Sequence, residues 1–271
     1  MMFRETPDGP IAITQPSHAW LSGQLVRAWG NHAFGPVTPY EDVCLAAEQH
    51  DLGWLMWEQS PTRDPETGRP HSFRQLGVSA HTGIWTLGTA MALGLGRYPA
   101  LLISLHGTGL YANFNAAAAD AGDRAAVREF LNGQQEIQQR LIASLRRDEH
   151  LGHLSGDDQI ERNRRLVRAA DRMSIAICTG MRDLAIRSDG PFEAKIEDVP
   201  TAAGNTDLQL LAEDGDITNV VVTPWPFAAP HVRVSCEGIK LPSQRFDDEQ
   251  EMRAALRDAK RVVLLTDLRP G

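Results

Sequence analysis

The pattern of hydrophobic and polar positions divides the 271-residue chain into two parts. In the first part, apolar residues recur every three or four positions, which is typical of helices that bury one face. After Gly190-Pro191 the apolar runs become short, β-branched or alternating, and turn residues separate them. The pattern predicts a helical body at 1–190 and a small appendage of antiparallel strands at 191–271.

Helix signals place the elements of the body more closely. Thr38, Pro39 and Glu41 form a strong start, with a capping hydroxyl, a proline at the first helical position and a capping-box carboxylate. The last helix of the body is apolar on most sides, as expected for a central buried helix. The predicted helices span 17–29, 38–51, 79–95, 99–110, 123–147 and 157–187, after a short strand around 11–14. The predicted strands span 207–212, 219–223, 231–236 and 261–266, with a helix at 247–258 before the last strand.

A long polar segment at 58–75 separates the second and third predicted helices. Loops of this length inside a compact domain are usually functional or disordered. We therefore interpret this segment as a flap near a functional site.

Charge and hydropathy exclude several classes of protein. The formal net charge is −8, whereas a nucleic-acid-binding protein usually presents a basic face. No apolar run reaches the roughly 18 residues that span a bilayer, and the N-terminus lacks the apolar core of a signal peptide. We therefore expect a cytoplasmic protein that binds neither nucleic acid nor membrane.

The cysteines narrow the chemistry of any metal site. Cys44, Cys178 and Cys236 lie far apart and form no Cys-x-x-Cys pair. This spacing favours neither a disulfide framework nor a thiolate zinc site. A metal ion in this protein would therefore be bound by nitrogen and oxygen atoms.

Several histidines and aspartates occupy the apolar faces of the predicted helices. Burying such groups without partners costs several kcal/mol, so a metal ion or a dense hydrogen-bond network is expected beside them. Taken singly, each histidine could be a satisfied core or capping residue, and Asp171 could pair with an arginine. Together they fall on five helices that could pack around one point, which predicts a metal site. The residues are His18, His50, Asp51, His81, His106 and Asp171.

The order of these six residues resembles the HD-domain superfamily of helical metalloproteins, over about residues 12–188. The two histidines between the His-Asp pair and the last aspartate resemble its binuclear branch, which includes HD-GYP cyclic dinucleotide phosphodiesterases and di-iron oxygenases such as myo-inositol oxygenase. The strings Trp29-Gly30-Asn31, His50-Asp51-Leu52-Gly53-Trp54 and Leu105-His106-Gly107-Thr108-Gly109-Leu110-Tyr111 are closest to a bacterial family of unknown function.

The resemblance implies a mainly α fold, an HD-like helical bundle with a small C-terminal α+β appendage. It implies that His18, His50, Asp51 and Asp171 hold one divalent metal and that Asp51 bridges to a second metal. His81 and His106 would hold that second ion. Nitrogen and oxygen ligands suit iron, manganese or nickel, with zinc or magnesium as further options.

One position departs from the binuclear pattern. Many relatives carry His-Asp-x-Gly-Lys, and their lysine faces an anionic substrate, but this chain has Trp54 at that position. The change favours a less charged or partly aromatic substrate, unless Arg69 or Arg74 from the loop replaces the lysine. Alternatively, Trp54 packs against neighbouring helices and has no contact with substrate.

These observations lead to a functional expectation. We expect a metal-dependent hydrolase of a phosphoester or similar small metabolite, with a metal-activated water as nucleophile and His50 and Asp51 at the catalytic centre. The alternatives are a di-iron oxygenase and a non-catalytic metal-bearing sensor whose appendage binds a partner. The sequence leaves open the substrate, the native metal and the oligomeric state, for which a homodimer is one option.

Overall fold

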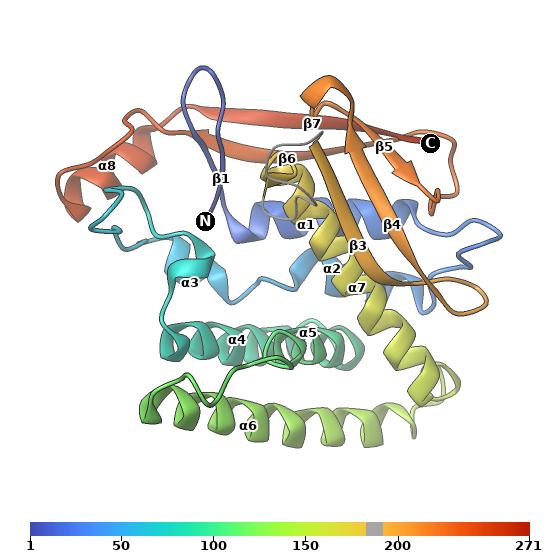
Figure 1. The fold of residues 1–271 in the computed structure, drawn as a ribbon. Coiled ribbons are helices and arrows are strands. Elements are labelled where there is room, and N and C mark those ends of the chain that lie inside the picture. The colour runs from blue at the N-terminus through green and yellow to red at the C-terminus, as the bar shows by residue number, and fades with distance from the viewer. Residues whose placement is uncertain (183–191) are drawn as a thin grey trace.

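A computed structural model describes residues 1–182 and 192–271 of the chain. In Figure 1 the sheet lies along one side, α1, α2 and α7 lie next to it, α4 and α5 follow, and α6 covers the far side. The helices are α1 (Gln15–Ala28), α2 (Tyr40–Gln49), α3 (Trp54–Glu58), α4 (Val78–Ala92), α5 (Arg97–Gly109), α6 (Ala121–Leu145), α7 (Asp157–Cys178) and α8 (Glu249–Asp258).

The strands form one seven-stranded sheet in the order β1-β2-β6-β7-β5-β4-β3. Neighbouring strands are antiparallel, except that β5 and β7 are parallel. The two N-terminal strands join the C-terminal ones through β2, whose Ile11 pairs with Lys240 of β6. The strands are β1 (Met2–Arg4), β2 (Ile11–Ile13), β3 (Phe192–Pro200), β4 (Asn205–Ala212), β5 (Asn219–Thr223), β6 (Val232–Lys240) and β7 (Arg261–Pro270).

The predicted fold class, mainly α with a small appendage, is wrong. The fold is α+β, because the C-terminal strands belong to a large mixed sheet that also takes in the N-terminus. Strands β1 and β2 are only three residues long. Such short strands show almost no periodic pattern, and their pairing with β6 depends on contacts between distant parts of the chain.

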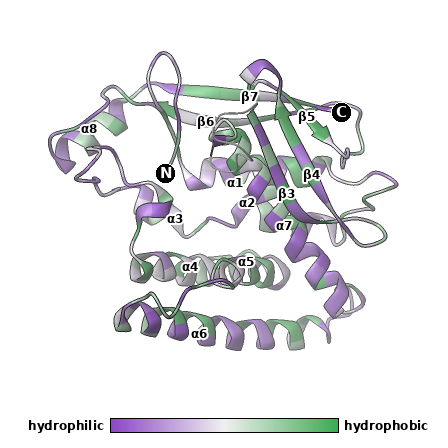
Figure 2. Ribbon diagram, viewed as in Figure 1, coloured by the Kyte–Doolittle hydropathy of each residue, from purple (hydrophilic) through white to green (hydrophobic). Residues whose placement is uncertain are grey.

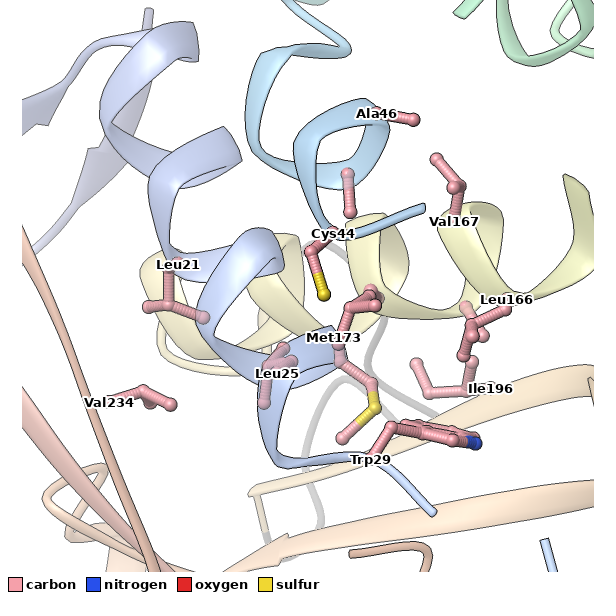
Figure 3. Packing of buried hydrophobic residues seen from close by; sticks show 14 of the residues in the cluster. Leu21, Leu25, Trp29, Cys44, Ala46, Leu166, Val167, Met173, Ile196 and Val234 are labelled. Carbon is pink, nitrogen blue, oxygen red and sulfur yellow. The ribbon is translucent and has the colours of Figure 1, made fainter. Parts of the chain in front are cut away.

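One hydrophobic cluster joins the sheet to the helices. Figure 3 shows Leu25 of α1 and Met173 of α7 near Trp29, with Ile196 of β3 and Val234 of β6 at the edges of the same cluster. All five side chains are buried. Burial of this apolar surface holds α1 and α7 beneath the sheet, and these two helices carry several of the predicted ligands.

The boundaries of some predicted elements change. The helix predicted at 157–187 ends at Cys178, and its predicted part at 183–187 lies outside the described residues. The domain boundary predicted at residue 190 lies outside them as well and stays a prediction. In Figure 2 the first half of α7 is hydrophilic, and its second half is more hydrophobic where it runs beneath the sheet.

The predicted flap is shorter than expected and is held in place. Helix α3 takes up its first residue, Glu58, and a 3₁₀ turn at Phe73–Gln75 takes up its last three. Between them, Arg63 Nε donates to the Phe246 carbonyl at 2.7 Å, and Arg253 Nε donates to the Pro61 carbonyl at 3.0 Å. The segment therefore packs against the region around α8.

The three cysteines are free and buried. Cys178 at the end of α7 and Cys236 in β6 approach each other, with 3.7 Å between their sulfur atoms. Among the helices of residues 1–182 and 192–271, none has the length and apolar character needed to cross a membrane.

Candidate metal centre

Four helices bring imidazole and carboxylate groups to one buried point. His18 comes from α1, His50 caps the C-terminus of α2 and Asp51 follows it, and His106 and Asp171 come from α5 and α7. Each of these side chains is buried. Their ligand atoms form two overlapping groups that share His50: one with His18 and Asp51, the other with His106 and Asp171.

Close backbone contact at Gly53 places this point beside α4. A Cβ atom at Gly53 would lie 2.1 Å from the Ile84 carbonyl oxygen and 2.9 Å from the Gly88 amide nitrogen. Glycine is therefore required where the chain leaves the His50-Asp51 pair, since any side chain would push α4 away.

His50 directs one ring nitrogen into the centre of the cluster. Its Nδ1 lies 2.8 Å from the Ala47 carbonyl, which can only accept, so Nδ1 carries a proton and donates it. In the neutral ring Nε2 then presents a lone pair. This buried Nε2 has no hydrogen-bond partner among the described residues, although Asp171 Oδ1 lies 3.3 Å away and Asp51 Oδ2 lies 3.5 Å away.

His18 is oriented in the same way by a hydroxyl group. Ser174 donates its proton to the Asp171 carbonyl at 2.7 Å and receives a hydrogen bond from Ser22 at 2.9 Å. It therefore accepts from His18 Nδ1, 2.7 Å away. His18 Nε2 lies 2.6 Å from Asp51 Oδ2, and with the proton on Nδ1 this second nitrogen can offer its lone pair to a metal ion.

This arrangement could hold a cation. Two imidazole lone pairs and two carboxylates face one another away from water, and like-charged groups at such distances repel strongly. Metal-binding histidines commonly donate their other ring nitrogen to a carbonyl or similar acceptor, as His18 and His50 do. The orphaned Nε2 of His50 and the set of nitrogen and oxygen donors therefore fit a divalent metal ion.

The pKa values describe the same centre without a metal. Burial lowers the pKa of His50, but the charges of Asp51 and Asp171 outweigh burial and raise it to about 9. Burial opposes ionisation of Asp51 and Asp171, yet the neighbouring histidines hold both pKa values below the ordinary range. A proton on His50 thus supplies part of the positive charge that the carboxylates demand. For His106, burial lowers the pKa to about 4, so its ring is neutral.

His81, the sixth predicted ligand, lies beside this cluster and outside both groups of ligand atoms. Its Nδ1 is 2.5 Å from the Tyr111 hydroxyl oxygen, and its Nε2 accepts from the indole N–H of Trp85 at 3.2 Å. Both ring nitrogens are therefore engaged by other side chains. The structure brings five of the six predicted ligands into the cluster and gives His81 a separate network.

A pocket of about 350 Å³ opens onto the cluster, where Asp51, His106 and Asp171 form part of its wall. Trp54 lines it as well, with its ring 5.8 Å from that of His81. Arg74 is in the lining, whereas Arg69 is turned away and bonds Glu5 at 2.7 Å. Other lining residues include Gln15, Phe73, His81, Trp85 and Tyr111.

A family match covers both the cluster and the pocket. The family DUF3891, described as a protein of unknown function, matches residues 1–243. The chain belongs to this family. The match takes in all the helices of the centre and the strands from β1 to β6. No curated protein and no solved structure matches the chain. Membership of the DUF3891 family indicates no particular reaction. The resemblance to HD domains stays a prediction.

Sequence reasoning missed several residues of this DUF3891 site. The sequence pattern singles out neither Ser22 nor Ser174, although each lies on the same helix face as a predicted ligand, four residues after His18 and three after Asp171. Their position was the only available signal, because serine is common on helix surfaces. Tyr111 lies in one of the strings that carry the family resemblance, and the resemblance implies no role for it.

Proposed function

We propose that this DUF3891 member is a metal-dependent hydrolase of a small phosphoester or similar metabolite, with an HD-type centre. His18, His50, Asp51 and Asp171 would hold the metal, with His106 beside them. One observation carries the proposal: two imidazole lone pairs and two carboxylates face one another at the wall of a pocket of substrate size. Buried groups of this kind cluster at functional sites.

A divalent metal in this position supplies Lewis acidity and lowers the pKa of a bound water towards neutrality. The protein residues have separate tasks. Asp51 and Asp171 reach both the cluster and the pocket, so their carboxylates can hold or accept a proton beside the substrate. The neutral ring of His106 offers a further acceptor at the pocket wall. The indoles of Trp54 and Trp85 give the same space apolar walls.

We propose one metal ion, where the sequence suggested two. A second metal would need His81 as a ligand. However, Trp85 donates to Nε2 of His81, and Tyr111 occupies Nδ1. An ion at Nε2 would displace the hydrogen bond from Trp85, and an ion at Nδ1 would displace the one to Tyr111. The remaining donors form one compact group that shares His50, which suits a single site.

Elemental analysis of the purified protein tests the proposal. We expect about one equivalent of a first-row divalent metal such as manganese, iron or nickel. Asp171→Ala should remove it, because the variant loses a charged ligand, and it should stay folded, because the histidines can remain neutral. Asp158→Ala, an exposed position on the same helix, should retain the metal. Turnover of 4-nitrophenyl phosphate and its diester should follow metal content across the variants.

Two results would change this view. Equal metal content in Asp171→Ala and the unmodified protein would refute the proposed site. Bound iron together with substrate-dependent oxygen consumption would favour an oxygenase instead, because iron accepts the same nitrogen and oxygen ligands.

A further inference from the structure

The hydrogen bonds around His81 fix the direction of every proton in that network. An indole N–H can only donate, so His81 Nε2 accepts from Trp85, 3.2 Å away. A neutral imidazole carries its single proton on the other nitrogen, so Nδ1 donates to the Tyr111 oxygen, 2.5 Å away. Burial lowers the pKa of His81 and so favours the neutral ring that this reasoning assumes.

The network leaves the hydroxyl proton of Tyr111 available. Because its oxygen accepts from His81, Tyr111 must donate its own proton elsewhere, and the described residues offer it no other acceptor. Burial raises the pKa of Tyr111 to about 12, which keeps this proton in place. Tyr111 lines the pocket that opens onto the metal centre. Its proton therefore has a ligand or a water molecule in this pocket as its natural acceptor.

The other side chains in the pocket wall indicate which class of ligand the pocket would bind. Trp54, Trp85 and Phe73 give the pocket flat aromatic walls, and Arg74 adds one guanidinium, whose carbon lies 5.2 Å from the Phe73 ring centroid. Flat apolar walls favour a flat apolar body. The hydroxyl proton of Tyr111 and a metal ion at the centre would both favour an oxyanion at one end of that body.

We propose that the pocket binds a compact aryl oxyanion and that Tyr111, oriented by His81 and Trp85, donates a hydrogen bond to one of its oxygen atoms. The oxyanion is a phosphoryl or carboxylate group. This inference rests on the proposed function for the identity of the site, since it names the class of substrate that the metal centre would act on. His81 is then a positioning residue.

Calorimetric titration with non-hydrolysable probes tests the ligand class. Phenylphosphonate and benzoate represent the two oxyanions, and methylphosphonate and acetate lack the aryl group. We expect the better aryl probe to bind at least about tenfold more tightly than its methyl counterpart, because its ring is buried against the indoles. Whichever aryl probe binds more tightly identifies the oxyanion. Equal affinity for aryl and methyl probes would overturn the proposed class.

Tyr111→Phe tests the hydrogen bond, because it removes the hydroxyl and keeps the ring. We expect roughly tenfold weaker binding of the better aryl probe, as for loss of one hydrogen bond to a charged group, with unchanged metal content. The control is Tyr40→Phe, since the exposed Tyr40 donates to the Arg27 carbonyl away from the pocket. Unchanged affinity in Tyr111→Phe would overturn the role of Tyr111.

Nitrogen-15 chemical shifts of the imidazoles test the orienting network directly. We expect His81 as the Nδ1–H tautomer near neutral pH, and the Nε2–H tautomer would overturn the assignment. Metal content, measured on every sample, separates the two proposals. Probe binding that depends on Tyr111 in a protein without metal would refute the hydrolase alone. Bound metal without selectivity for aryl probes would refute only the inference made here.

Discussion

Two sets of histidines lie side by side in this protein: His18 and His50 form the first, and His81 alone forms the second. They differ in the hydrogen-bond partners of their ring nitrogens. His18 and His50 donate from Nδ1 to a hydroxyl and a carbonyl oxygen, and direct Nε2 at carboxylates. His81 is satisfied at both nitrogens by the neutral side chains of Tyr111 and Trp85. The first set could hold a cation at its centre, whereas the hydrogen bonds of the second are complete without one.

The contrast shows that residue type and a position near the pocket do not by themselves distinguish a metal ligand from a substrate-binding residue. His50 and His106 are buried and His81 is half-buried, and all three lie near the same pocket. The difference comes from the partner of the second nitrogen, which determines where the ring presents a lone pair. Three further experiments test this difference, beginning with the largest expected effect.

Gly53→Ala should disturb both sets at once. The new Cβ would lie 2.1 Å from the Ile84 carbonyl, and backbone cannot move aside as a flexible side chain can. We expect about 3 kcal/mol of lost stability, the upper range for overpacking, together with weaker metal and probe binding because α4 shifts. Chemical denaturation measures the stability. Gly77→Ala is the control, since a Cβ there meets nothing within 4 Å. A fully stable Gly53→Ala protein would show that the contact does not position α4.

Ser174→Ala should affect only the metal centre. It removes the acceptor that orients His18, and loss of such a partner typically weakens metal binding by about 10–100-fold. The binding affinity of the aryl probe should still depend on Tyr111, because the His81 network has no contact with Ser174 in the described structure. Competition with a metal chelator measures the affinity, with the exposed Ser60→Ala as control. Unchanged metal affinity in Ser174→Ala would contradict the orienting role of the hydroxyl.

The pH dependence should also separate the two sets. In the metal-free protein the pKa of His50 is raised to about 9, because Asp51 and Asp171 outweigh the effect of burial. Metal must displace that proton at lower pH, so metal affinity should rise about tenfold per pH unit between roughly 7 and 9 and level off above. Titration calorimetry in buffers of different ionisation enthalpy should detect the proton released. Metal affinity that is constant between pH 7 and 9 would contradict this linkage.

The local spacing of apolar and polar residues explains why the positions of most helices could be predicted from the sequence. Helices were expected near α1, α2 and α4 to α8, because a helix that buries one face repeats apolar residues at a fixed interval. Polar residues that interrupt such a face are visible in the same pattern, which is how His18 and Asp171 were selected. The i, i+4 spacing of His81 and Trp85 was visible as well and could have predicted their hydrogen bond.

The features that the sequence did not reveal depend on contacts between segments that lie far apart in the chain. Strand β2 joins β6 across more than 200 residues, and no local signal in three residues reveals that partner. Ser174 orients His18 although the two are 156 residues apart in the chain. The sequence alone therefore determined which residues would be buried on helices and which donor atoms they would carry. Only the tertiary structure decided the α+β fold and which nitrogen of each histidine faces the centre, because both depend on contacts that form when the helices and the sheet pack together.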